Sequence, residues 1–173
     1  AVLAAAAKAA IALGVVKDGW NGFNILHTAA SRVAGLDLGL VTPKGIDGLV
    51  GMDVAYLLGA DEIDMKLLGS AFVIYQGSHG DAGAHRADVI LPGAAYTEKS
   101  ATYVNLEGRA QMTAKAAFAP GEAKEDWAII RALSAEAGHT LPFDSLAELR
   151  AEMYKTAPHL ARLNSVAPAD AGA

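Results

Sequence analysis

The chain has 173 residues, of which 53% are hydrophobic and 19% charged, and its formal net charge is −5. This composition is typical of one packed globular domain. Because no basic cluster is present, we expect neither nucleic acid nor an anionic lipid surface as a partner. The sequence contains no cysteine, which excludes disulfides, thiolate metal sites and iron–sulfur ligation within these residues.

The alanine-rich beginning of the chain predicts a helix over residues 1–16, ending near Gly14. Lys8 and Lys17 bracket its apolar run, which is too short to cross a membrane, and no membrane insertion is predicted. The stretch also lacks the initiator methionine and the charged region of a signal peptide. Since it is typical of the interior of a helix, we expect the chain to begin partway through a larger protein.

The next fifty residues predict one helix and one long connection. A turn is expected at residues 19–21, followed by a helix over residues 23–36, where apolar side chains recur at helical spacing. Gly35 is expected to end that helix. The glycines and the proline of residues 39–52 then indicate a loop.

Three short apolar runs predict buried parallel strands at residues 54–58, 71–76 and 89–91, the last ended by Pro92. Residues 62–68 lie between the first two and are long enough for about two helical turns. Strands that alternate with helix-length segments favour an α/β fold with an open, mostly parallel sheet and flanking helices.

The C-terminal third predicts a β-arm and two helices. Residues 101–118 are rich in β-branched and aromatic residues, so we expect an extended hairpin with Gly108 at a bulge or turn. A helix within residues 119–138 is marked by acids at its start and by a glycine at its end. A final helix is expected at residues 145–155. The stripe of the first helix that we expect to be buried against the sheet comprises Trp127, Ile130, Leu133 and Ala137.

We therefore expect one domain over residues 1–156 and a tail over residues 157–173. The tail is rich in alanine and proline and offers little apolar surface to offset the entropy of ordering. It is expected to be mobile or bound to a partner.

Two clusters on loops have both a functional and a structural interpretation. Gly77, Gly80 and Gly83 follow a predicted strand and would let backbone N–H groups approach a phosphate or a pterin, or they form a tight structural loop. His79 and His85, near acidic residues, would suggest a metal, but their irregular spacing is more typical of surface histidines.

The segment of residues 87–111 concentrates polar side chains. Glu98 and Glu107 would be an acid–base pair of the glycosidase type, or carboxylates of solvated loops. No G-x-S-x-G pattern is present, so a serine nucleophile of that class is excluded. Asp88 and Arg109 are more suggestive of bridges between segments, because an Arg fork binds carboxylates or backbone carbonyls.

The same segment resembles the molybdopterin oxidoreductase superfamily, whose signature is A-D-V-V-L-P, a Glu, and G-T-x-x-N-x-E-G-R-x-Q. Here it appears as "ADVILP", Glu98 and "ATYVNLEGRAQ". Over about residues 20–160 the chain resembles, within that superfamily, the large iron–sulfur subunits of respiratory complex I, NADH:quinone oxidoreductase. The positions that match the signature are Asp88, Glu98, Thr102, Asn105, Glu107, Gly108 and Arg109.

Two departures from the active molybdenum enzymes accompany this resemblance. Those enzymes have a threonine-rich segment before A-D-V-V-L-P that helps to hold the pterin nucleotide, and here Asp81, Ala82 and Gly83 stand there. Ala101 also replaces the glycine of the G-T pair. The resemblance therefore implies a vestigial cofactor-binding frame with no catalytic residue, cofactor or metal in this segment. The alternative is a fragment of an active molybdopterin oxidoreductase of the formate dehydrogenase type.

The resemblance further implies a role in electron transfer from NADH through flavin and iron–sulfur clusters to quinone, coupled to proton translocation. The 2Fe–2S and 4Fe–4S clusters would be held by an N-terminal region outside this sequence. The implied partners are other peripheral-arm subunits, including the flavin subunit that binds NADH. The implied location is the cytoplasmic side of the bacterial inner membrane or the matrix side of the mitochondrial inner membrane.

Overall fold

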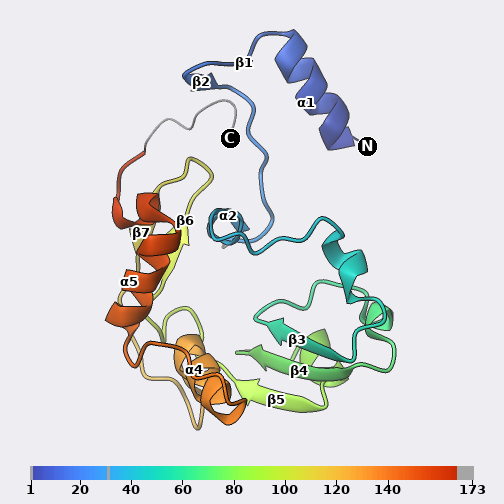
Figure 1. Ribbon diagram of the computed structural model, residues 1–173, viewed down its shortest axis with the longest axis vertical. Coiled ribbons are helices and arrows are strands. Elements are labelled where there is room, and N and C mark those ends of the chain that lie inside the picture. The colour runs from blue at the N-terminus through green and yellow to red at the C-terminus, as the bar shows by residue number, and fades with distance from the viewer. Residues whose placement is uncertain (1, 31, 167–173) are drawn as a thin grey trace.

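The computed structural model describes residues 2–30 and 32–166 (Figure 1). Its elements, in chain order, are α1 (Val2–Ala12), β1 (Val16–Lys17), β2 (Trp20–Asn21), α2 (Arg32–Asp37), η1 (Gly45–Leu49), β3 (Val54–Leu58), η2 (Met65–Leu68), β4 (Phe72–Gly77), α3 (Ala82–Arg86), β5 (Val89–Pro92), β6 (Thr102–Val104), β7 (Ala110–Met112), α4 (Asp126–Glu136), α5 (Leu146–Thr156) and η3 (Pro158–Ala161), where η denotes a 3-10 helix.

The central feature is a parallel sheet of β3, β4 and β5, in that order. Val54 is paired with Phe72, and Ile74 with Val89. The three strands lie where the apolar runs predict them, and the expected α/β fold with a parallel sheet and flanking helices is confirmed. Continuous apolar runs predict parallel strands because the strands of parallel sheets are typically covered on both faces and so have apolar side chains at successive positions.

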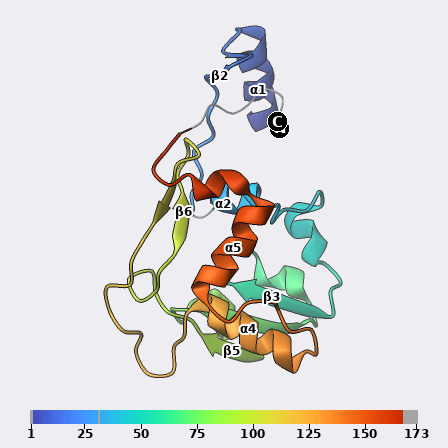
Figure 2. The ribbon, with the colours of Figure 1, turned by 60° about the vertical axis from the view of Figure 1, so that its left-hand side comes forward.

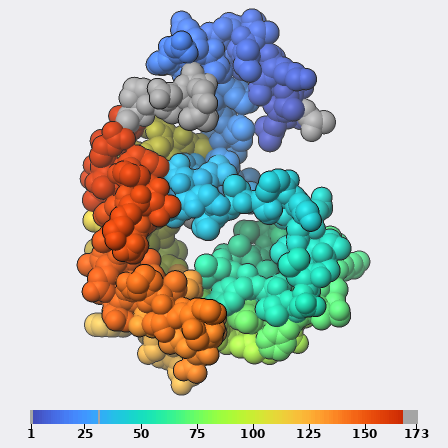
Figure 3. Space-filling view, in the orientation of Figure 1, coloured from blue at the N-terminus to red at the C-terminus, as the bar shows by residue number. Residues whose placement is uncertain are grey.

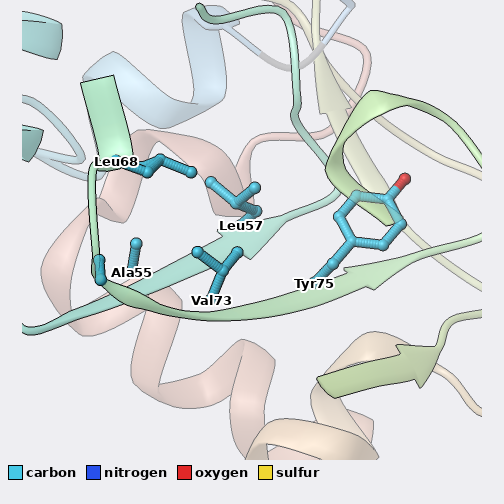
Figure 4. Close-up of a cluster of buried hydrophobic side chains, with 6 residues drawn as sticks. Ala55, Leu57, Leu68, Val73 and Tyr75 are labelled. Atoms are coloured by element: carbon cyan, nitrogen blue, oxygen red, sulfur yellow. The ribbon is translucent and has the colours of Figure 1, made fainter. Parts of the chain in front are cut away.

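One face of the sheet carries the main core (Figure 4). The connections η2, between β3 and β4, and α3, between β4 and β5, both contribute side chains that pack against this face. The buried members of the cluster are Ala55, Leu57, Leu68, Ala71, Val73 and Tyr75. Since both connections cross in the same direction along the sheet, right-handed crossovers place them on the same side.

A second core joins the β6–β7 hairpin to the C-terminal segments, and α5 lies along that hairpin (Figure 1). Val104 and Ala110 of the hairpin pack with Ala157 and Leu160. Part of the segment that composition predicts to be a tail is thus packed, because Leu160 is fully buried. Residues 167–173 of that expected tail lie outside the described residues.

The end of the molecule away from the sheet is formed by α1 and the β1–β2 hairpin, as Figures 1 and 2 both show. The hairpin occupies the place where the sequence predicts only a turn. Gly19 supports its reversal with a φ of 72°, a backbone conformation that glycine adopts without strain.

The helix predicted at residues 23–36 is wrong over most of its length, since α2 spans only Arg32–Asp37. The chain after β2 is tied to the hairpin by a bond from the Gly22 amide to the Val15 carbonyl at 2.7 Å. Leu26, an apolar residue within that predicted helix, is 80% exposed. An apolar spacing produces a helix only where its stripe has a surface to pack on.

The segment between β3 and β4 also differs from its prediction, being a single 3-10 turn over Met65–Leu68. The Asp64 carboxylate accepts a bond from the Lys66 amide at 3.0 Å, which starts the turn. Gly69 ends it with a φ of 52°. The capping residues therefore limit this connection to one turn.

The helices α4 and α5 begin and end close to their predicted residues. Ser145 caps α5 by accepting from the Glu148 amide at 3.2 Å. The predicted buried stripe of α4 is wrong, however, because no residue of α4 is fully buried and Leu133 is 36% exposed. The polar contacts of α4 with the sheet are made at its first residue, Asp126, and not along its length.

Truncation of two neighbouring leucines should distinguish the two faces of β3. Leu57 is 6% exposed and Leu58 is 48% exposed. In urea unfolding of this chain, Leu57→Ala should lose about 2–5 kcal/mol of stability, because it opens a cavity in the main core. Leu58→Ala, the matched control, should lose about 1 kcal/mol or less. Equal losses for the two variants would contradict the assignment of the faces.

Candidate functional site

The glycine loop after β4 closes around a tyrosine ring. A Cβ added at Gly83 would lie 2.6 Å from the Tyr75 ring and 2.9 Å from the Asp61 Cβ, and a Cβ at Gly77 would meet the Tyr75 hydroxyl. The Tyr75 hydroxyl donates to the His79 carbonyl at 3.2 Å. The space that these two glycines leave is therefore occupied by a side chain of the protein itself.

Carboxylates border the same loop. The Asp61 carboxylate accepts from the Gly83 amide at 2.8 Å. Burial, together with the charges of Asp61 and Asp81, raises the pKa of Tyr75 above its ordinary value of 10.0. A phosphate brought to this loop would meet negative charge and a filled cradle, so the residues present do not fit a pterin nucleotide.

The two histidines of the loop do not converge. His79 shares a 2.9 Å contact between its Nδ1 and the Ser78 hydroxyl, and His85 is exposed on α3. Across residues 2–30 and 32–166, no group of three or more His, Asp or Glu side chains is arranged to hold a metal ion.

Asp88 joins the beginnings of β4 and β5. Its carboxylate accepts from the Val73 amide at 2.8 Å, and its own amide donates to the Val73 carbonyl at 2.8 Å. Arg86 lies 3.5 Å from the same carboxylate. The Arg86 guanidinium also donates to the carbonyls of Gly69 and Ala71, at 3.1 and 2.9 Å. Asp88 and Arg86 together connect the segment before β5 to the segment that leads into β4.

Asn105 builds the turn between β6 and β7. Its side-chain oxygen accepts from the amides of Glu107 and Arg109 at 2.9 and 3.0 Å. Gly108 completes the turn with a φ of 78°, in the conformation that favours glycine. The expected hairpin with Gly108 at its turn is thus confirmed.

Arg109 ties the hairpin to the C-terminal segment. Its guanidinium donates to the Asn164 carbonyl at 2.7 Å, and the Asn164 amide donates to the Ala110 carbonyl at 2.8 Å. Glu107 lies 3.9 Å from the Arg109 guanidinium, on the exposed side of the turn. The two bonds to Asn164 therefore join the hairpin to the C-terminal segment.

The two glutamates considered as an acid–base pair lie in different turns. The Glu98 carboxylate accepts from the Ala95 amide at 2.9 Å, which closes a local turn before β6. Thr102 lies in β6, paired with Met112 of β7. A hollow of about 530 Å³ borders the hairpin and is lined in part by His27, Tyr103 and Asn105. Neither glutamate lines it, so it does not assemble an acid–base pair.

A buried polar network that the sequence did not indicate lies at the carboxyl ends of β3 and β4. Gln76 is fully buried, and its amide nitrogen donates to the Asp126 carboxylate at 2.9 Å. Its amide oxygen accepts from the Tyr56 hydroxyl. Lys99 forms an ion pair with the other oxygen of Asp126. The only signal in the sequence is that Gln76 interrupts the apolar run of β4.

The protonation of Tyr56 is part of this network. Burial, with a smaller contribution from the Asp126 charge, raises the pKa of Tyr56 above its ordinary value of 10.0. Because the folded-state pKa is raised, the stabilisation is fully present below pH 10.0 and is lost as the pH rises past the shifted value. The network is therefore intact at neutral pH.

The comparisons with known proteins identify the class to which this fold belongs. The family model of the molybdopterin oxidoreductases matches residues 1–136. The chain belongs to the molybdopterin oxidoreductase family.

Within that family the chain is homologous to a subunit of NADH-ubiquinone oxidoreductase. It is 52% identical over 152 residues to the 75 kDa subunit of Reclinomonas americana, a match covering 85% of this chain and 22% of that protein. It is 54% identical over 150 residues to the mitochondrial 78 kDa subunit of Candida albicans, covering 86% and 21%. It is 46% identical over 170 residues to the mitochondrial NADH dehydrogenase (ubiquinone) iron-sulfur protein 1 of Solanum tuberosum, covering 98% and 23%.

The chain thus spans roughly a fifth of the length of these relatives. None of the helices in the described part of the chain is long and apolar enough to cross a membrane.

Replacement of the buried amide tests the network directly. Gln76→Leu keeps the approximate volume but leaves the Tyr56 hydroxyl and one Asp126 oxygen without their partner. We expect a loss of about 1–3 kcal/mol in urea unfolding, the cost of leaving buried polar groups unpaired. Gln111→Leu, at an exposed glutamine of β7, should change stability by less than about 0.5 kcal/mol. A Gln76 variant as stable as this control would contradict the network's role.

Proposed function

We propose that this chain is a structural domain of the large iron–sulfur subunit of a complex I-type NADH:quinone oxidoreductase. The observation that carries the proposal is the identity of 46–54% to such subunits over at least 85% of the chain. The motif residues add support, since Asp88 and Arg109 bond to backbone of other segments and Asn105 holds the turn of the β6–β7 hairpin. Their role in this proposal is architectural.

The whole subunit passes electrons from NADH, by way of flavin and 2Fe–2S and 4Fe–4S clusters, towards quinone, coupled to proton translocation. This chain supplies no cluster ligand, because it has no cysteine. The clusters are held by polypeptide outside this sequence. The molybdopterin cofactor of the family does not fit here, because Tyr75 fills the cradle and Asp61 and Asp81 border it.

The partners are other peripheral-arm subunits of the complex, including the flavin subunit that binds NADH. The complex places the chain on the cytoplasmic side of a bacterial inner membrane or the matrix side of the mitochondrial one. Support for the latter is that two of the relatives carry the word mitochondrial in their names.

Truncation of Arg109 in the full-length subunit tests the scaffold role. Arg109→Ala removes the bond to the Asn164 carbonyl and should cost about 1 kcal/mol of domain stability. We expect less assembled complex in the membrane, measured by affinity purification of the tagged subunit. The NADH–ferricyanide turnover per assembled complex should stay unchanged. Arg162→Ala, at an exposed arginine, is the control. Normal assembly with reduced turnover would contradict the proposal.

Elemental analysis of the purified 173-residue chain tests the absence of a redox centre. We expect molybdenum, tungsten and iron below stoichiometric amounts, because the chain has no thiolate and its glycine loop is filled. An NADH–ferricyanide assay of the same sample should give no turnover above the buffer blank. Stoichiometric metal or measurable turnover would favour an active molybdopterin oxidoreductase instead.

A further inference from the structure

The parallel sheet is covered on one face and largely open on the other. The outward face carries the even-numbered residues of β3 and β4 and, through the register, Val89 of β5. The corner at Gln76 is closed by the first residue of α4, and Tyr56 and Ile74 on this face are half-buried. The large apolar side chains left exposed on this face are Val54 at 56%, Leu58 at 48%, Phe72 at 47% and Val89 at 40%.

The topology explains why this chain leaves the face open. Both crossovers, η2 and α3, pack on the core side, as right-handed connections in a sheet of order β3-β4-β5 require. In a doubly wound sheet, the opposite face is covered by helices of crossovers that step along the sheet in the opposite direction. Those crossovers connect strands that lie beyond the first strand of the existing order, here β3. Such strands would pair with the outer edge of β3.

The outer edge of β3 is free among the described residues, since β3 is paired with β4 alone. The bonds at its two ends run from the Phe72 amide to the Asp53 carbonyl at 2.9 Å and from the Gly59 amide to the Gln76 carbonyl at 2.7 Å. The backbone N–H and C=O groups of the odd-numbered residues of β3 thus point towards β4. Because these groups alternate along a strand, the amides of Val54, Tyr56 and Leu58 point away from β4. The far edge of β5 is different, because Gly93 forms a bridge with Lys124.

The chain before β3 adds to the apolar character of this region. The large hydrophobic side chains of residues 36–52 that are about half exposed or more are Leu36, Leu40, Val41, Ile46, Val50 and Met52. Figure 3 shows an opening in the middle of the molecule, bordered by this segment, the sheet and the α4–α5 region. A long, apolar and unprotected edge is a hazard that folded proteins avoid by covering it.

We propose that a βα unit from the remainder of the full-length subunit completes this sheet. Its strand, of continuous aliphatic residues, pairs parallel with the outer edge of β3. Its amphipathic helix covers Val54, Phe72 and Val89 on the open face. The inference rests on the proposed function, because the occupant comes from the longer polypeptide. The relatives supply the necessary length, since this chain covers only 20–23% of each.

Hydrogen exchange in the full-length subunit within the purified complex tests this, with an internal control. The amides of Ala55 and Leu57 face β4 and should exchange slowly in any case. If the strand is added, the outward amides of Val54, Tyr56 and Leu58 should also exchange at least about 100-fold more slowly than an unstructured peptide. Outward amides that exchange near the unstructured rate, beside protected inward ones, would overturn the proposal. If the protection of these outward amides is lost on dilution, the edge is covered by a second copy of the subunit, which would also overturn the proposal.

Proline variants of the full-length subunit give a second measurement. Leu58→Pro removes an outward amide, which an edge strand tolerates and an interior strand does not. We expect it to reduce the yield of soluble subunit at least about fivefold, as Leu57→Pro should by breaking the β3–β4 ladder. A Leu58→Pro subunit with wild-type yield and exchange would contradict the added strand. Failure of the subunit to co-purify with NADH–quinone activity would instead contradict the proposed function, while the exchange pattern of β3 is still measured.

Discussion

The hydrogen bond between the buried Gln76 amide and the Asp126 carboxylate ties the parallel sheet to the segments that follow it. It joins the central strand of the sheet to the first turn of α4. The Tyr56 hydroxyl, in β3, donates to the Gln76 amide oxygen, and Lys99, in the turn before the hairpin, pairs with Asp126. A fully buried amide without partners is costly, so the position of each of these segments is constrained by the others.

The same constraint agrees with the architectural role proposed for this chain. In an open α/β sheet, ligands bind at the carboxyl ends of the strands. Here Gln76 and Tyr75 stand at that end of β4, one in the network with Asp126 and the other under Gly83. Side chains of the protein thus satisfy one another where a ligand would bind in a relative.

The sheet could be predicted from the sequence because parallel strands are continuous apolar runs, and α5 because Ser145 and Glu148 mark its start. The helix predicted over residues 23–36 was wrong, because apolar spacing does not reveal whether the helix has a surface to pack on. The buried stripe on α4 failed for the same reason. The architectural interpretation of Asp88 and Arg109 followed from their chemistry. The Gln76 network did not, because its members are 20 and 50 residues apart in sequence.

A double-mutant cycle between Lys99 and Asp126 tests most directly whether the polar residues at this end of the sheet act as a structural clamp. Unfolding free energies of Lys99→Met, Asp126→Asn and the double variant would be compared with that of the unmodified chain. The account predicts a coupling of about 1 kcal/mol or more, because the pair is one connected unit with Gln76. Additive effects, within about 0.3 kcal/mol, would show that the two side chains act independently and would contradict the clamp.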